Sequence, residues 1–179
     1  IVNAANVNEA PSLSSTIAAS SFAETSLVGT TVATSSASDP ESSGITYSLS
    51  GTDSGNFSIA SDGTVTIGST LDYEAKGTYN FVLNAFDGTH TTSQQLIVTT
   101  TNVNEVPALS STLAASSFAE TSAVGTIIAT SSASDPESSG ITYSLSGTDS
   151  GKFSIASNGT GTIGSLLVYE TKQAYSITV

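Results

Sequence analysis

Hydrophobic side chains alternate with polar ones over several short stretches of the chain, which is the period-two pattern of half-buried β-strands. Turn-forming residues separate these stretches at 39–44, 51–55, Asp62-Gly63 and Asp87-Gly88. About seven such strands in about 96 residues predict an antiparallel sandwich of two sheets. The apolar positions that set the alternation are Ile45, Tyr47 and Leu49; Phe57 and Ile59; Val65 and Ile67; Tyr79, Phe81, Leu83 and Ala85; and Leu96 and Val98.

The chain contains an internal repeat with an offset of 96 residues. Residues 6–83 and 102–179 differ at only 18 of 78 aligned positions, which indicates a tandem array of small domains. We therefore expect residues 1–5 to be the end of a preceding repeat, 6–101 to be one complete repeat, and 102–179 to be a second repeat that lacks its last strand region. Because Gly161 replaces the inward-facing Val65, the second repeat is expected to be the less stable one.

The composition excludes several classes of protein. A formal net charge of −12, with three Lys and no Arg, excludes nucleic acids and anionic membranes as partners. Serine and threonine supply 62 of the 179 residues, and this composition favours strands over helices. The absence of Cys excludes disulfides, thiolate chemistry and Cys-based zinc sites. No apolar run reaches the roughly 20 residues of a membrane-spanning helix.

The placement of the acidic residues indicates a bound cation. Most of the 15 carboxylates stand beside Pro or Gly at the ends of predicted strands. Carboxylates within about 4–6 Å of each other repel, so acidic groups that are kept together without Lys or Arg favour a cation between them. With no Cys and a single His, the expected ligand atoms are oxygens, which select a hard ion such as Ca²⁺.

Catalytic residues are not indicated. A serine nucleophile needs a base with an orienting partner, and the only candidate base, His90, is interpreted as a surface-loop residue. Asp72 and Glu74 could imitate a glycosidase pair, but nothing in the pattern predicts the required cleft. We therefore expect no enzymatic activity.

Four motifs mark the chain: FAETSLVGTTVATSSASDPESSGITYSLSG, LDYE, AFDG, and the pair NVNEAP and NVNEVP. They occur in the order found in cadherins, and the whole chain resembles the bacterial cadherin-like form of that family. FAETSLVGTTVATSSASDPESSGITYSLSG (22–51) is similar to the stretch in which a Glu precedes a Gly-Thr strand, an Ala-x-Asp-x-Asp loop and a Tyr-Ser-Leu strand. LDYE (71–74), AFDG (85–88), and NVNEAP and NVNEVP (6–11 and 102–107) are similar to its Leu-Asp-Arg-Glu, Ala-x-Asp and linker motifs. The resemblance implies an all-β fold of two tandem antiparallel, seven-strand Greek-key sandwiches, cadherin- or immunoglobulin-like, at an extracellular or cell-surface location.

The resemblance also implies calcium ligands. At the junction between the two repeats they would be Glu24, Asp72, Glu74, Asn102, the main-chain carbonyl near Val103, Asn104, Glu105, Asp135 and Glu137. The junction with a preceding repeat would use Asn6, Asn8, Glu9, Asp39, Glu41 and Asp87, and Glu120 and Glu170 would face a following repeat. Val168 stands where the first repeat has Asp72, so a site after the second repeat is expected to be weak or missing.

We interpret the chain as a calcium-stiffened spacer or adhesion repeat of a long bacterial surface or secreted protein. Its expected partners are neighbouring repeats, with self-association and a cell-surface or polysaccharide target as further candidates. Two alternatives stay open. Residues 1–5 match the end of the strand region that the second copy lacks, so the chain could form a filament by strand complementation. A carbohydrate-binding module is the other alternative, which 7% aromatic residues and no Trp disfavour.

Overall fold

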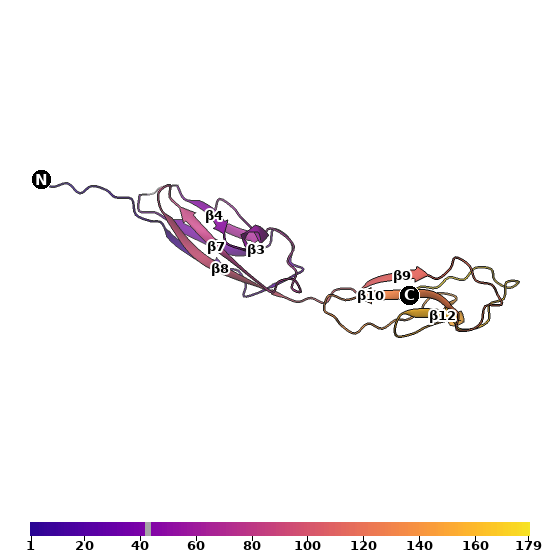
Figure 1. The fold of residues 1–179 in the computed structure, drawn as a ribbon. Helices are drawn as coiled ribbons and strands as arrows, with labels where there is room; N and C mark the ends of the chain where they lie inside the picture. The colour runs from indigo at the N-terminus through magenta and orange to yellow at the C-terminus, as the bar shows by residue number, and fades with distance from the viewer. Residues whose placement is uncertain (42–43) are drawn as a thin grey trace. The chain divides into compact units, whose positions relative to one another are not determined.

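The computed structural model of the chain describes residues 1–41 and 44–179 and contains two compact units, 1–103 and 104–179 (Figure 1). Ser42 and Ser43, which belong to the predicted turn at 39–44, lie outside the described residues. Strands and two short 3₁₀ turns, Ser54–Asn56 and Ser150–Lys152, make up the regular structure, so the all-β prediction is confirmed. No helix in the described ranges has the length and apolar character that a membrane crossing requires.

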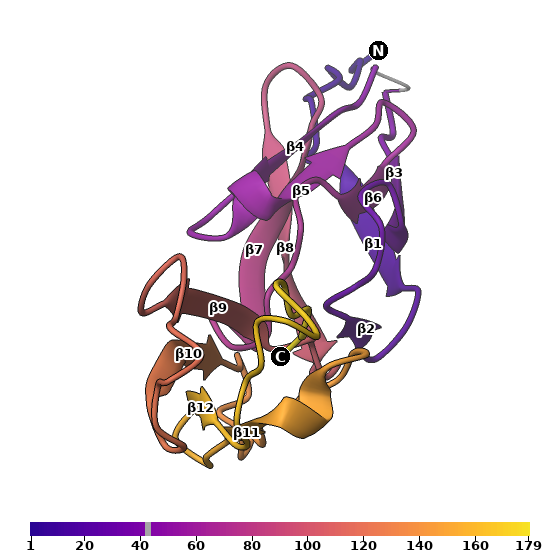
Figure 2. The ribbon, with the colours of Figure 1, turned by 90° about the vertical axis from the view of Figure 1, so that its right-hand side faces the viewer.

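The first unit is a sandwich of two four-stranded sheets (Figure 2). The strand order is β1-β3-β6-β5 in one sheet and β2-β8-β7-β4 in the other. Every pairing is antiparallel except that of β2 with β8, which is parallel. The strand bounds are β1 Ser12–Ile17, β2 Phe22–Ala23, β3 Thr31–Ser38, β4 Thr46–Ser50, β5 Phe57–Ile59, β6 Thr64–Ile67, β7 Thr78–Phe86 and β8 Thr91–Thr101.

The alternation of large apolar residues correctly predicted β4 to β8 of this unit. The alternation of apolar and polar residues is weaker in β1 and β3, because small residues occupy several of their inward positions. Examples are Ser15 and Ser35, whose hydroxyl oxygens are 2.9 Å apart. With the two-residue β2, the described part of the first unit has one strand more than the predicted seven. This short strand matters for the site because it fixes the chain immediately before Glu24.

The core of the first unit lies between its two sheets. Phe81, Ile67, Leu83, Val32, Val65 and Val98 are the largest side chains that are fully buried there. The ring of Phe57 stacks on Phe81 with centroids 4.2 Å apart and meets Tyr79 edge-on at 5.9 Å. Leu96 and Val98 of β8 close this core, with exposed fractions of 3% and 1%. Burial of these side chains provides the main stabilisation of the unit.

The predicted turn at Asp62-Gly63 forms and requires its glycine. Gly63 has a φ of +84°, and a Cβ at this position would lie 2.5 Å from the carbonyl oxygen of Ser35. Asp62 Oδ1 accepts a 2.9 Å hydrogen bond from the backbone N–H of Thr64, as expected of an ordinary turn-forming Asp. The turn therefore joins β5 to β6.

The second unit contains one four-stranded sheet, with the order β11-β12-β10-β9. Its strands are β9 Ala108–Leu113, β10 Ile127–Ser134, β11 Phe153–Ile155 and β12 Thr160–Ile163. Among the described residues of this unit, the only trace of a second sheet is a single bridge between Ser146 and Thr178. In the first unit the second sheet has four strands, and its β8 pairs with nine residues of β7. That the second repeat lacks its last strand region stays a prediction from the sequence.

Each unit contains the same lysine–aspartate pair. In the first, Asp53 Oδ1 lies 2.5 Å from Lys76 Nζ, and Asp53 Oδ2 accepts a 2.7 Å hydrogen bond from the backbone N–H of Asn80. These interactions lower the pKa of Asp53, the Asn80 N–H having the larger effect. Lys172 and Asp149 repeat the pair in the second unit at 2.5 Å. The pairs fasten the loop that precedes β7, or its equivalent, and they occupy two of the three lysines of the chain.

Candidate metal sites

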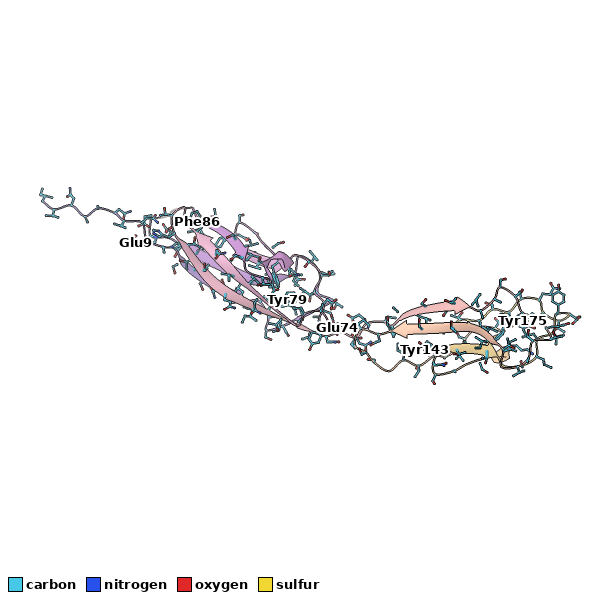
Figure 3. The ribbon with its side chains drawn as sticks, in the orientation of Figure 1. Glu9, Glu74, Tyr79, Phe86, Tyr143 and Tyr175 are labelled. Atoms are coloured by element: carbon cyan, nitrogen blue, oxygen red, sulfur yellow. The ribbon has the colours of Figure 1, made fainter. Side chains whose placement is uncertain are left out.

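Three carboxylates gather at one end of the first unit. One oxygen from each of Glu24, Asp72 and Glu74 lies within 4.8 Å of the other two. Figure 3 shows Glu74 at this end of the unit and Glu9 at the other. Glu24 is 6% exposed, whereas Asp72 and Glu74 face solvent. The group therefore has one fixed, buried member and two members that remain accessible to an ion.

Backbone hydrogen bonds hold Glu24 in place. Its Oε2 accepts a 2.7 Å hydrogen bond from the N–H of Tyr73, and its Oε1 accepts one of 2.6 Å from the N–H of Val103. Because Ala23 pairs with Thr101 through β2 and β8, the residues that follow these strands, Glu24 and Val103, end side by side. One carboxylate thus ties the 71–76 loop to the segment that follows β8.

Asp72 and Glu74 lie in a tight turn. Asp72 Oδ1 accepts a 2.8 Å hydrogen bond from the N–H of Ala75, and the Asp72 carbonyl accepts one from the N–H of Lys76. The side-chain amide of Asn102 donates a short hydrogen bond to Glu74 Oε1. The turn therefore directs both carboxylates toward Glu24, and it adds the amide of Asn102 to the same end.

The lysine nearest to this group in sequence, Lys76, pairs with Asp53. Three acidic groups this close repel one another unless a cation or protons intervene. The available donors are all oxygens, and hard cations with flexible coordination, such as Ca²⁺, prefer such donors. The donor chemistry thus fits the calcium ion that the sequence predicted.

A second acidic group forms at the opposite end of the first unit. The backbone N–H of Glu9 donates to Glu41 Oε2 at 3.3 Å, and the N–H of Glu41 donates to Asp39 Oδ1 at 3.0 Å. The side-chain amide of Asn8 donates to Asp87 Oδ2 at 2.9 Å. Asp87, which is 9% exposed, is therefore joined to the segment that precedes β1 across 79 residues of sequence. Asn6 adds a side-chain hydrogen bond to Glu41.

Glu9 and Glu41 behave as an interacting acid pair. A side-chain hydrogen bond with Glu41, together with repulsion from its charge, raises the pKa of Glu9. The same hydrogen bond lowers the pKa of Glu41. Without a cation, the pair therefore retains a proton on Glu9 to a higher pH than an isolated glutamate would, since two adjacent negative charges are unfavourable.

His90 contributes to this end in a way the sequence did not predict. Its Nδ1 lies 3.0 Å from the amide nitrogen of Asn8, and its backbone N–H donates to Asp87 Oδ1 at 2.7 Å. This N–H is the main reason that the pKa of Asp87 is lowered. The imidazole remains 46% exposed, as expected of a loop residue. The Asp-Gly turn at 87–88 was the available sequence signal for this arrangement.

The start of the second unit repeats part of this geometry. The backbone N–H of Glu105 donates to Glu137 Oε1 at 3.1 Å, as Glu9 does to Glu41. Asn104 Nδ2 donates to the carbonyl of Glu105 at 2.9 Å, and Asp135 Oδ1 accepts from the N–H of Ser139. Glu137 Oε2 is buried and has no hydrogen-bond donor. A buried carboxylate oxygen without a donor is unfavourable, and a cation would satisfy it.

The far end of the second unit departs from the first. Glu120 Oε2 accepts a hydrogen bond of 3.0 Å from the N–H of Tyr169, as Glu24 does from Tyr73. Val168 replaces Asp72 and is 41% exposed, and Glu170 faces solvent. In the described residues, Glu120 and Glu170 join no group of three acidic side chains.

A β-sandwich with acidic groups at the ends of its strands is typical of extracellular repeat modules, and comparison with known proteins gives matches of that kind. Residues 19–104 match the family described as "Cadherin domain". The matched residues cover most of the first unit, and the second repeat differs from the first at 18 of 78 aligned positions. Cadherin domains are non-catalytic extracellular adhesion modules that typically bind Ca²⁺.

The chain is also similar to longer cadherin proteins. It is 34% identical over 167 residues to the mouse "Cadherin EGF LAG seven-pass G-type receptor 1", a match that covers 87% of this chain and 5% of the mouse protein. The chain thus spans only a small part of that relative.

Solved structures share the fold. Human Protocadherin-24 EC1-2 Form II matches with a TM-score of 0.56 and 24% identity, over 84% of this chain and 75% of that chain. PcdhgB3 EC1-4 matches with a TM-score of 0.60 and 22% identity, over 96% and 44%. Protocadherin Gamma B7 extracellular domains 1-4 match with a TM-score of 0.55 and 25% identity, over 93% and 44%. These similarities confirm the sandwich fold.

Proposed function

We propose that the chain is a calcium-stiffened spacer in a long extracellular adhesin or fibre. Calcium ions bind at the ends of the repeats, where they restrict the linker between successive sandwiches. Neighbouring repeats of the same polypeptide are its main partners. Adhesive specificity then belongs to other parts of the parent protein, and this segment contributes length and stiffness.

The observation that carries this proposal is the group formed by Glu24, Asp72 and Glu74. Their oxygens lie within 4.8 Å of one another, although the residues come from segments 48 to 50 positions apart in sequence. The neighbouring lysine, Lys76, pairs with Asp53. A bound calcium ion would offset the repulsion among the three carboxylates and fix the 71–76 loop.

The linker connects this group to the second repeat. Val103 donates its N–H to Glu24, and the next residues along the chain, Asn104 and Glu105, are predicted ligands that begin the second unit. An ion that takes oxygens from Glu24 and from this linker, together with Asp135 and Glu137, would restrict rotation between the repeats. The same reasoning assigns Asn6, Asn8, Glu9, Asp39, Glu41 and Asp87 to a preceding junction, and Glu120 and Glu170 to a following one.

The affinity is expected to be modest. Asn102 and Asn6 stand where cadherins prefer Asp, so each junction carries less negative charge than a typical cadherin junction. Extracellular calcium modules commonly bind at about 10⁻⁴ to 10⁻³ M, and fewer carboxylates favour the weaker end of that range. Such an affinity suits a protein that meets millimolar calcium outside the cell.

Calcium calorimetry on the full chain tests the proposal. We expect saturable binding that Asp72→Asn with Glu74→Gln weakens by about tenfold or more, since both changes remove ligand charge. The matched control is Asp62→Asn, which also removes one carboxylate of the first repeat and introduces the residue that the second repeat already has, Asn158. Absence of binding up to about 10 mM Ca²⁺, beyond the usual extracellular range, would overturn the proposal.

A bacterial parent protein completes the proposal. Near-identity of the two repeats supports a recently expanded array whose function depends on number and reach. The relatives with a named organism are human and mouse proteins, so the source of the chain stays a prediction.

The carbohydrate-binding alternative has weak support, because Tyr79 is 4% exposed and Tyr47 packs against the core. Pull-down on chitin, cellulose and pectin would test it.

A further inference from the structure

The loop between β11 and β12 contains the one asparagine of the sequence that a glycine follows, Asn158-Gly159. The N–H of Gly159 donates to the carbonyl of Ala156 at 2.9 Å, and the N–H of Ala156 donates to the carbonyl of Thr160 at the same distance. Gly159 has a φ of +81°, so the segment is a short hairpin loop that ends in a left-handed glycine. Asn158 is exposed in this loop.

The side chain of Asn158 folds back onto the residues that follow it. Its Oδ1 accepts a 3.0 Å hydrogen bond from the backbone N–H of Thr160. This hydrogen bond closes a ring that contains the carboxamide carbon of Asn158 and the peptide nitrogen of Gly159, which keeps these two atoms near each other. The same donor polarises the carboxamide C=O, and it stabilises negative charge that develops on Oδ1 when a nucleophile adds to the carbon.

The first unit has the same loop with an acid in place of the amide. Asp62 Oδ1 accepts a 2.9 Å hydrogen bond from the N–H of Thr64, and the N–H of Gly63 donates to the carbonyl of Ala60 at 3.0 Å. The hydrogen bond from Thr64 is the main reason that the pKa of Asp62 is lowered, so this carboxyl group is ionised at neutral pH. A carboxylate resists nucleophilic attack far better than a neutral carboxamide does. The two loops therefore share a geometry and differ in reactivity.

We propose that Asn158-Gly159 is a site of spontaneous deamidation through a cyclic imide. The backbone nitrogen of Gly159 attacks Cγ of Asn158, the new N–Cγ bond closes the ring, the Cγ–Nδ2 bond breaks, and ammonia leaves with the proton that the Gly159 nitrogen gives up. Water then opens the ring. Opening at Cγ gives aspartate, and opening at the main-chain carbonyl gives isoaspartate. The net reaction consumes water and releases ammonia, with no oxidation or reduction.

Two features of the loop set the rate of this reaction. Gly159 has no Cβ to hinder the approach of its nitrogen to Cγ. Its N–H, however, is held by the carbonyl of Ala156, so the nitrogen attacks only when the loop opens locally. The rate should rise with pH because the attacking nitrogen must lose its proton.

The two products have different effects on the hairpin of β11 and β12. Aspartate is the residue that the same loop of the first unit holds, so it fits and adds one negative charge. Isoaspartate inserts a methylene group into the backbone beside Gly159, where space is short. A Cβ on Gly159 would lie 2.1 Å from the carbonyl oxygen of Ser131 and 3.3 Å from the ring of Tyr143. Isoaspartate therefore loosens the pairing of the two strands.

Peptide mapping by mass spectrometry tests the proposal on the full chain, aged at physiological temperature and mildly alkaline pH. We expect Asn158 to convert at least about tenfold faster than Asn56, because the side chain of Phe57 hinders the corresponding attack. Isoaspartate at position 158, detected with an isoaspartate methyltransferase, identifies the imide route. The matched variant is Asp62→Asn, which should create a second reactive position in the same loop of the first unit.

The outcomes that would overturn the proposal are specific. Equal conversion of Asn158 and Asn56, or conversion of Asn158 without isoaspartate, would exclude attack by the Gly159 nitrogen. The variant Asn158→Asp carries the charge of the product without the altered backbone, so it isolates the effect of isoaspartate. We expect the second unit of the aged chain to unfold at a lower denaturant concentration than in this variant. Equal unfolding midpoints would overturn the effect assigned to isoaspartate.

Discussion

The carboxylate of Glu24 accepts a hydrogen bond from the backbone N–H of Val103, 79 residues later in the chain, at 2.6 Å. This contact depends on the parallel pairing of β2 with β8, which brings the residues after both strands together. Because Glu24 is 6% exposed and also accepts from Tyr73, its position is set by the sandwich itself. The most buried acidic group of the candidate site is thus a direct product of the fold.

Substitution of Glu24 should affect calcium more than folding. Glu24→Gln keeps an oxygen that can accept from Val103 but removes the charge, so we expect calcium affinity to fall by at least about tenfold. Calorimetry measures the affinity, and thermal unfolding in chelator measures the fold. Glu120→Gln is the matched control, because Glu120 makes the same contact with Tyr169 but belongs to no group of three carboxylates among the residues that the structure describes. An equal loss of calcium affinity in both variants would contradict this assignment.

Restoring the acidic residue of the second repeat should create a site. Val168→Asp places a carboxylate between Glu120 and Glu170 in the pattern of Glu24, Asp72 and Glu74, so we expect one additional calcium ion to bind at about 10⁻³ M. Val168→Asn, which adds polarity without charge, is the control and should bind no additional ion. Unchanged stoichiometry in the Asp variant would show that these three positions do not suffice.

Filling the position of Gly161 should stabilise the second unit. Its counterpart Val65 is completely buried, and a Cβ on Gly161 would meet Ala129 and Ile128 at ordinary contact distances of 3.6–3.7 Å. Burial of the side chain and the higher strand propensity of valine predict a gain of about 1–3 kcal/mol for Gly161→Val. Denaturant unfolding measures this gain. The reciprocal Val65→Gly should destabilise the first unit by at least about 2 kcal/mol, and a neutral or destabilising effect of Gly161→Val would refute the comparison.

The acid pair at the other end of the first unit predicts a pH dependence. The pKa of Glu9 is raised in the folded chain, so its contribution to stability is present at low pH and is lost as the pH rises through that raised value. In chelator, stability should therefore decrease as the pH rises above the ordinary pKa of a glutamate, and more so in the wild type than in Glu9→Gln. Calcium should abolish the difference because it offsets the repulsion between Glu9 and Glu41. Identical pH profiles of the two proteins in chelator would contradict it.

The sequence predicted those parts of the fold that large alternating side chains determine. Tyr79, Phe81 and Leu83 identified β7 because each places a bulky apolar group on one face. Strand β1 and the two-residue β2 gave no comparable signal, since their existence depends on partners that lie far away in the sequence.

The candidate metal site was likewise only partly predictable from the sequence. The motifs around Asp72 and Glu74 could be recognised as sequence, whereas the hydrogen bond between Glu24 and Val103 required the strand pairing. The part played by His90 was missed because it depends on the side-chain amide of Asn8, 82 residues earlier. The sequence motifs therefore indicated which acidic residues to consider as ligands, and the structure supplied the hydrogen bonds that hold them in place.

Small-angle scattering on the full chain in millimolar calcium and in chelator tests the central claim most directly. We expect a larger radius of gyration and a narrower distribution of conformations in calcium. The variant with Asp72→Asn and Glu74→Gln should give the chelator profile under both conditions, while circular dichroism shows that its sandwiches remain folded. Equal radii of gyration for variant and wild type in millimolar calcium would contradict the claim that calcium stiffens the junction between the repeats.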